Sequence, residues 1–126
     1  MSSIAPDQQT ILSVLAITDT SNHYTGVLDM SNTPYKKITF ITNCSLNQAT
    51  TLRLFGSKDG GVTALALTNG YTITGGSGQP SDISLVANPG WTMLGTLTDI
   101  HDFLQWRVVA SVAPNSGSIT IIAIYE

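Results

Sequence analysis

Hydrophobic and polar residues alternate with a period of two along most of the chain, in short runs separated by Gly, Pro, Asn and Asp. This period is typical of β-strands, and no long segment shows the periodicity of a helix. Many short strands at this spacing predict an all-β fold, an antiparallel β-sandwich or jelly roll. Strands are expected at residues 11–18, 27–30, 36–42, 50–57, 62–67, 69–74, 83–87, 91–97, 105–112 and 118–125.

The length of 126 residues suits a single domain that buries roughly two thirds of its unfolded surface. Residues 1–9 are expected to form an extended N-terminal arm, and residues 10–126 the sandwich. The last two runs flank a turn at residues 113–117 and predict a long antiparallel hairpin. The remaining expectations are a loop at 19–26, an outward-facing loop at 75–82 and one helical turn at 99–103.

Three of the expected strands have apolar residues on both faces. In residues 118–125, Ile122 and Ile124 face away from the other isoleucines, and residues 11–17 and 62–67 show the same pattern. A sandwich has one interior, so it covers only one face of each strand. The second face therefore requires another cover, because soluble monomers rarely expose large apolar patches.

We expect a second copy of the chain to provide that cover, so a homo-oligomer is the expected form. The alternative is that loops at 18–35 or 75–90 fold over the exposed face. The residues expected at contacts with other subunits come from the arm and from the first and last strands: Ile4, Ile11, Leu12, Val14, Ile122, Ile124 and Tyr125.

Charged residues make up only 10% of the chain, against about 25% in typical domains. Ser, Thr, Asn and Gln together make up a third of it. Such a surface offers little electrostatic repulsion between copies, which favours association.

The net charge of −3 and the lack of a basic stripe argue against nucleic acid as a partner. No apolar run approaches the ~20 residues of a membrane-spanning helix, so no membrane partner is expected. The start of the chain lacks the basic residues of a secretory signal, and the lone Cys44 suits assembly in a reducing compartment.

The sequence contains no nucleophile elbow, phosphate-binding loop or paired-cysteine motif, so no catalytic residue, cofactor or metal site is expected. Two alternatives stay open. Trp91 and Tyr71 could stack on a sugar in a carbohydrate-binding module. His101, which lies between Asp99 and Asp102, could serve a small hydrolase.

Two segments resemble small β-sandwich structural proteins of tailed bacteriophages. They are residues 52–61, LRLFGSKDGG, and residues 104–126, LQWRVVASVAPNSGSITIIAIYE. The shared features are a strand that ends in Gly-Ser before an Asp-Gly turn, and a C-terminal unit that turns through Pro-x-Ser-Gly. The resemblance implies a virion protein made in the host cytoplasm, and it implies a homotrimer, because decoration proteins of this kind are often trimers. It would be a capsid decoration (cement) protein that contacts the major capsid protein, or a tail or fibre component.

Overall fold

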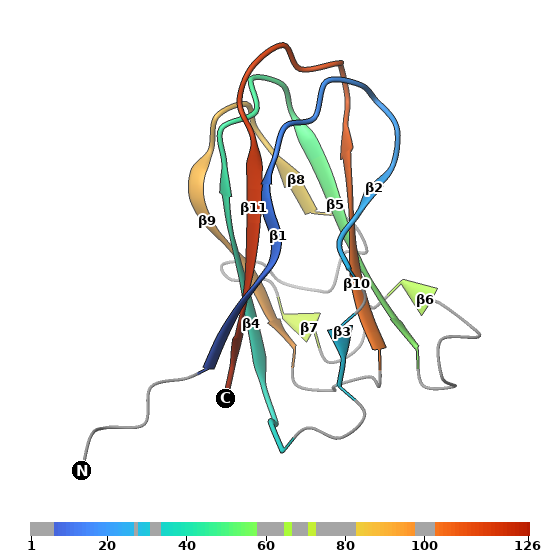
Figure 1. The fold of residues 1–126 in the computed structure, drawn as a ribbon, viewed down its shortest axis with the longest axis vertical. Coiled ribbons are helices and arrows are strands. Elements are labelled where there is room, and N and C mark those ends of the chain that lie inside the picture. Colours follow the sequence, from blue (N-terminus) through green and yellow to red (C-terminus); the bar gives the residue numbers. More distant parts are fainter. Residues whose placement is uncertain are drawn as a thin grey trace.

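A computed structural model describes residues 7–26, 28–30, 34–57, 65–66, 71–72, 83–97 and 103–126, and every regular element in these residues is a β-strand (Figure 1). The strands form two antiparallel sheets packed as a sandwich, which confirms the predicted fold class. The strands are β1 (Asp7–Leu15), β2 (His23–Tyr24), β3 (Leu28–Asp29), β4 (Ile38–Cys44), β5 (Thr50–Ser57), β6 (Leu65–Ala66), β7 (Tyr71–Thr72), β8 (Ile83–Leu85), β9 (Gly90–Leu97), β10 (Phe103–Ala110) and β11 (Ile119–Tyr125).

The first sheet has five strands in the order β1-β11-β4-β9-β7. The second has the order β2-β10-β5-β6, with β3 also pairing with β10 and β8 also pairing with β5. The long strands β4, β9 and β11 therefore lie opposite β5 and β10 across the sandwich (Figure 1).

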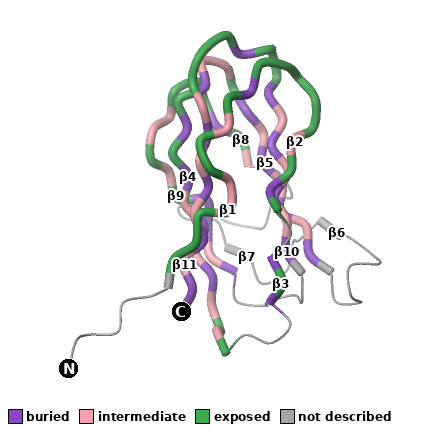
Figure 2. The backbone as a smooth tube through the Cα atoms, in the orientation of Figure 1, coloured by how far each residue is buried: buried purple, intermediate pink, exposed green. Residues whose placement is uncertain are grey.

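The core lies between the sheets and is built from alternate residues of the long strands (Figure 2). In β4 and β11 every second residue is buried, as the period of two requires. Trp106 of β10 meets Phe40 of β4 edge to face, with ring centroids 5.2 Å apart. This pair joins the two sheets at the centre of one apolar cluster.

The prediction that residues 105–112 and 118–125 form a hairpin is wrong. β10 pairs with β5 in the second sheet, whereas β11 pairs with β4 in the first. The connection from β10 to β11 crosses between the sheets, as the connection from β4 to β5 does. Both strands have a buried face, and those faces meet across the core instead of lying side by side in one sheet.

The two crossing connections are held together by backbone hydrogen bonds. Ser45 N–H donates to the Ser118 carbonyl over 2.8 Å, and Ser111 N–H donates to the Ala49 carbonyl over 3.0 Å. These bonds satisfy backbone groups that a sheet ladder would otherwise pair. The crossing is thus a specific structure rather than an open loop.

Strand β1 differs from the expectation in where it begins and in the regularity of its pairing. It begins at Asp7, so residues 7–9 of the expected arm pair with β11, and residues 1–6, with Ile4, lie outside the described residues. The pairing of β1 with β11 shifts register twice, between Thr10 and Leu12 and between Leu12 and Leu15. Such bulges let neighbouring residues turn to the same side of a sheet.

The bulges reduce the second apolar face that was expected of the first strand. Ile11, Leu12 and Leu15 all pack against the core cluster, although strict alternation would place Leu12 opposite the other two. Of the residues expected on the second face, Leu12 therefore packs within the same chain, whereas Val14 and Ala16 are exposed.

Other expectations are only partly within the described residues. β2 falls in residues 19–26, which were expected to be a loop. Only Leu65–Ala66 is described of the expected strand at 62–67, so its two faces are not assigned. Of the helical turn expected at 99–103, only Phe103 is described, and it begins β10. The loop at 75–82 lies outside the description.

Candidate interaction face

The outer face of the first sheet, which points away from the core, carries apolar residues across its central strands. Ile122 of β11 is the register partner of Ile41 of β4, and Ile41 is the partner of Met93 of β9. Ile124 lies two residues after Ile122, and Trp91 lies two residues before Met93, on the opposite side of this row. Trp91 is 63% exposed and Met93 is 47% exposed, while the three isoleucines are half-buried. These five residues are called the outer patch below.

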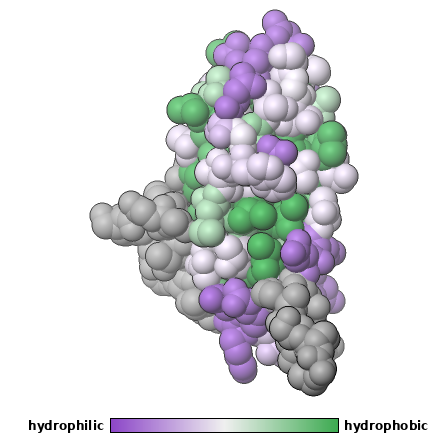
Figure 3. All heavy atoms as spheres, turned by 90° about the vertical axis from the view of Figure 1, so that its left-hand side faces the viewer, coloured by the Kyte–Doolittle hydropathy of each residue, from purple (hydrophilic) through white to green (hydrophobic). Residues whose placement is uncertain are grey.

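Uncharged polar residues surround the outer patch. The charged pair nearest to it along the strands is Lys37 and Glu126, with Nζ and Oε1 3.4 Å apart, at the end of the sheet. Figure 3 views the molecule from the side of β9 and shows apolar surface at mid-height, with hydrophilic surface toward both ends. Covering this face costs little desolvation, because hydroxyls lose less on burial than ions. The other described outward positions of these strands are Gln8, Thr10, Thr39, Asn43, Thr96 and Thr120.

The structure places the predicted contact residues in different environments. Ile122 and Ile124 lie on the outer face, as the period of two indicated. Ile11 and Leu12 pack toward the core. Val14 is 67% exposed on the edge strand, and its N–H donates to Thr120 Oγ1 over 3.1 Å.

Tyr125 belongs to the core of its own chain, with only 6% of its surface exposed. Its ring stacks on Tyr35 with centroids 5.2 Å apart, and its hydroxyl donates to Gln9 Oε1 over 2.8 Å. Burial raises the pKa of Tyr125 above its ordinary value of 10.0. Tyr125 therefore fastens β1 to the sheet within one copy and offers little surface to a partner.

The two aromatic residues considered for a sugar site are both in the first sheet. Trp91 lies in the outer patch with an exposed ring. Tyr71 is the register partner of Leu97 at the far edge of the sheet, and its side chain lies outside the described part of the structure. Of these two residues, only Trp91 offers a stacking surface within the described part of the structure.

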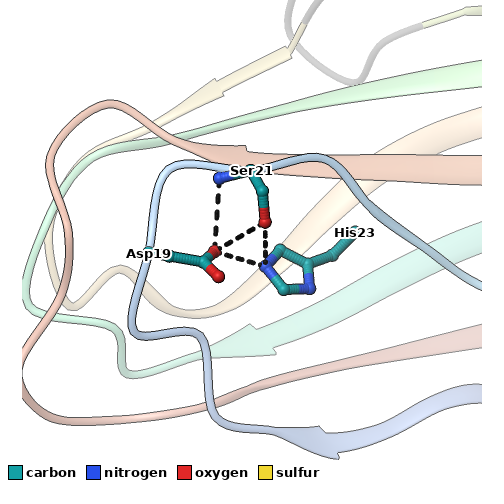
Figure 4. Close-up of polar contacts among 3 residues, drawn as sticks. All are labelled: Asp19, Ser21 and His23. Carbon is teal, nitrogen blue, oxygen red and sulfur yellow. Dashed lines mark hydrogen bonds and ion pairs between the residues drawn. The ribbon is translucent and has the colours of Figure 1, made fainter.

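A cluster of three polar residues lies in the loop before β2 (Figure 4). Asp19 Oδ1 is 2.7 Å from His23 Nε2 and accepts a bond of 2.9 Å from the Ser21 hydroxyl. The Ser21 hydroxyl is also 3.3 Å from the same ring nitrogen. The hydrogen bonds formed by His23 and Ser21 lower the pKa of Asp19 below its ordinary value of 3.8.

This cluster has the residue types of a hydrolase triad but a different geometry. In a triad the carboxylate and the hydroxyl bind different nitrogens of the imidazole, so the ring can pass a proton between them. Here both contact Nε2, and the Ser21 hydroxyl points its proton at Asp19. Ser21 N–H also donates to Asp19 Oδ1 over 3.2 Å, which is a common way of closing a turn. The cluster stabilises the loop and does not generate a nucleophile.

The described residues contain no group of three or more His, Cys, Asp or Glu side chains suited to a metal ion. Within the same residues no helix is long and apolar enough to cross a membrane. His101, with Asp99 and Asp102, falls outside the described ranges.

Known proteins share the fold of this chain but not its sequence. No protein-family model matches the chain, and no curated protein matches it. The solved structure of XepA, a PBSX exported protein, aligns with 99% of the chain at a TM-score of 0.70 and 9% identity. YomS, an SPBc2 prophage-derived protein, aligns with all of it at 0.57 and 11%, and PirA at 0.55 and 7%.

The chain spans 39% of the length of XepA, 99% of YomS and 97% of PirA. It therefore corresponds to part of XepA and to nearly the whole of the other two. At these identities the likeness shows the fold alone. The β-sandwich expected from the phage resemblance is confirmed, and a prophage-derived protein shares it.

Proposed function

We propose that this chain is a non-enzymatic structural protein of a bacteriophage particle, a capsid decoration protein that associates with itself as a trimer through the outer patch and binds the shell as that trimer. The observation that carries the proposal is the outer patch, an apolar and uncharged sheet face at the surface of the sandwich. The shared fold with a prophage-derived protein supports it.

The size of the face sets the expected strength of one contact. Four long strands about 4.8 Å apart and seven residues long at about 3.4 Å each cover roughly 450 Å². A standard interface buries about 800 Å² on each partner. A single contact of this size should therefore be weak. Linking several copies would raise the overall affinity without new contacts, which is why an oligomer suits attachment to a repeating shell.

The mechanism is stabilisation by preferential binding. A protein that bridges neighbouring shell subunits binds the assembled shell better than the separated subunits, so it raises the free energy of disassembly. This requires a stable surface and no chemistry, in keeping with the loop cluster of Asp19, Ser21 and His23, whose geometry does not activate a nucleophile.

Self-association is tested by analytical ultracentrifugation of the chain and two variants. Ile122→Asp places a charge in the outer patch and should yield monomers. Val109→Asp makes the same change at a half-buried, outward position of β10 in the other sheet and should leave the oligomer intact. A wild-type chain that stays monomeric at high micromolar concentration would overturn the oligomer, and so would an Ile122→Asp variant that assembles normally.

Shell binding is tested on heads of the phage that encodes the chain, prepared from a strain lacking the gene. Adding the protein back should raise the temperature at which the heads release their DNA, and Ile122→Asp should lose this effect. Heads that bind none of the added protein would contradict the decoration role even if the chain forms an oligomer.

The exposed ring of Trp91 favours a second candidate, a glycan-binding component of a tail or fibre. Sugar rings pack their apolar faces on exposed aromatic rings, and Trp91 offers such a surface. Binding on a glycan array that Trp91→Ala abolishes would support this candidate. An array without hits would remove it.

A further inference from the structure

Val14 of β1 holds a backbone conformation that valine avoids. Its φ of 41° lies in the left-handed region, where Asn88 is the only other non-glycine residue of the described part of the chain. Asn tolerates this region because its short side chain can hydrogen-bond locally, whereas a β-branched residue at positive φ is strained. Such strain persists only where the surrounding structure imposes it, and strained residues concentrate at functional sites.

The bulge in β1 imposes the strain. The register of β1 with β11 shifts between Leu12 and Leu15, and this leaves two residues of β1 opposite Thr120. Val14 is one of these two residues, and its N–H donates to Thr120 Oγ1 over 3.1 Å. Leu12 and Leu15 both pack against the core cluster, so β1 cannot slip along β11 to relieve the strain without exposing one of them.

The side chain of Val14 makes no contribution to the core that would offset this strain. It is 67% exposed, and it belongs neither to the core cluster nor to the apolar residues that pack against the cluster. Asn or Gly would hold the same φ with less strain and would suit an exposed position equally well. A strained and exposed valine therefore points to a use of its side chain outside its own chain.

Val14 adjoins the outer patch. Thr120 lies on the outer face of β11, two residues before Ile122 of the patch. A position beside Thr120 is thus a diagonal neighbour of Ile122, and diagonal neighbours about 7–8 Å apart are within reach of a shared apolar contact. The residues around this point, Ser13, Thr10 and Thr120, are uncharged. Val14 therefore extends the apolar surface of the outer patch to the β1 edge of the sheet.

We propose that Val14 is a contact residue between copies of this chain, and that its strain is retained because association buries the valine side chain. The inference rests on the proposed self-association through the outer patch and names the residue where that contact reaches the sheet edge. The occupant is the sheet face of a second copy. An added strand fits less well, because the bulge interrupts the row of backbone groups that it would pair with.

Val14→Asn tests the proposal because it should change stability and association in opposite directions. Asn adopts a positive φ more readily, so the unfolding temperature should rise by about 3–6 °C at a dilution where the chain is monomeric. The apolar contact is lost, so analytical ultracentrifugation should show association weakened about tenfold per contact. Val14→Ile keeps the strain and the branched apolar side chain, so it should match the wild type in both measurements.

Val86→Asn is the matched control. Val86 is 71% exposed in the connection from β8 to β9 and has no positive φ. This variant should change the unfolding temperature by less than about 2 °C and association by less than about twofold. An unfolding temperature of Val14→Asn that is unchanged or lower would refute the strain, and association at the wild-type level would refute the contact.

The outcomes also separate this inference from the proposed function on which it rests. An oligomer that Ile122→Asp breaks and Val14→Asn leaves intact would overturn the role of Val14 alone. A wild-type chain that stays monomeric would overturn the self-association and this inference together. If Val14→Asn weakens binding to the phage heads without changing self-association, Val14 contacts the shell and not a second copy, which would also overturn the inference.

Discussion

The connection that passes from one sheet to the other between β10 and β11 depends on a glycine that no other residue can replace without moving the backbone. Gly117, in the connection between β10 and β11, has a φ of +94°. A Cβ at this position would lie 1.9 Å from the Ser45 carbonyl oxygen and 2.7 Å from the Leu46 nitrogen. Both contacts are with backbone, which cannot rotate away as a side chain can. Gly117→Ala must therefore push the two connections apart.

The cost of Gly117→Ala has two parts. An L-residue in a left-handed conformation costs about 1–2 kcal/mol. Separating the connections also weakens the Ser45–Ser118 backbone bond and the packing of Leu46, which is fully buried. Each backbone bond contributes about 1 kcal/mol, and a displaced core leucine costs a further 1–3 kcal/mol. The expected loss is about 3–6 kcal/mol, a large part of the 5–15 kcal/mol of a typical domain.

Urea unfolding of three glycine variants separates these parts. Gly90 has a φ of +72° but open space around the position of a Cβ, so Gly90→Ala should lose only the conformational part, about 1–2 kcal/mol. Gly26 has open space and no such φ, so Gly26→Ala should change stability by less than about 1 kcal/mol. If Gly117→Ala unfolds within about 0.5 kcal/mol of Gly90→Ala, the close approach of the two connections is refuted.

Further outcomes follow from the described surroundings of Tyr125, Asp19 and Cys44. Tyr125→Phe should lose about 0.5–1.5 kcal/mol with the hydrogen bond to Gln9. Because the pKa of Tyr125 is raised in the fold, the stability that its protonated hydroxyl contributes should be fully present below pH 10 and should be lost as the pH rises further. A pH series of unfolding curves should show this loss in the wild type and not in Tyr125→Phe. The carboxyl of Asp19 should titrate by NMR below 3.8 and move up toward that value in His23→Gln; an unchanged midpoint would contradict the loop contact. Cys44 is fully buried, so a thiol reagent should label it only as fast as the native chain opens, and rapid labelling would contradict that burial.

Local alternation predicted most strands because it depends only on which residues are apolar. The strand at residues 50–57 coincides with β5, and the alternation of residues 118–125 placed Ile122 and Ile124 outward correctly. Pairing could not be predicted in the same way. A turn at 113–117 fits a hairpin and a crossing between sheets equally well, and the choice depends on the contact with the distant connection at 45–49.

Bulges explain most of what the sequence missed about the candidate face. The pairing of β4 with β9 shifts register beside Phe40, which allows Leu94 and Leu97, three residues apart, to be buried on the same face. In β1 the bulge turns Leu12 inward, to the same side as its neighbour Ile11. A period of two contains no sign of an inserted residue, so an apolar run with a bulge cannot be distinguished from a strand with two apolar faces.

The same bulges bear on how copies of the chain could associate. β1 is an edge of the first sheet, and a regular edge can add a strand from another molecule. Val14 has a φ of 41°, unusual for a β-branched residue, and lies where the ladder with β11 is irregular. This interrupts the row of backbone groups that an added strand would need. Association through the flat face, mediated by side chains such as Ile122, is therefore favoured over strand addition, and a single charged substitution there should be enough to prevent it.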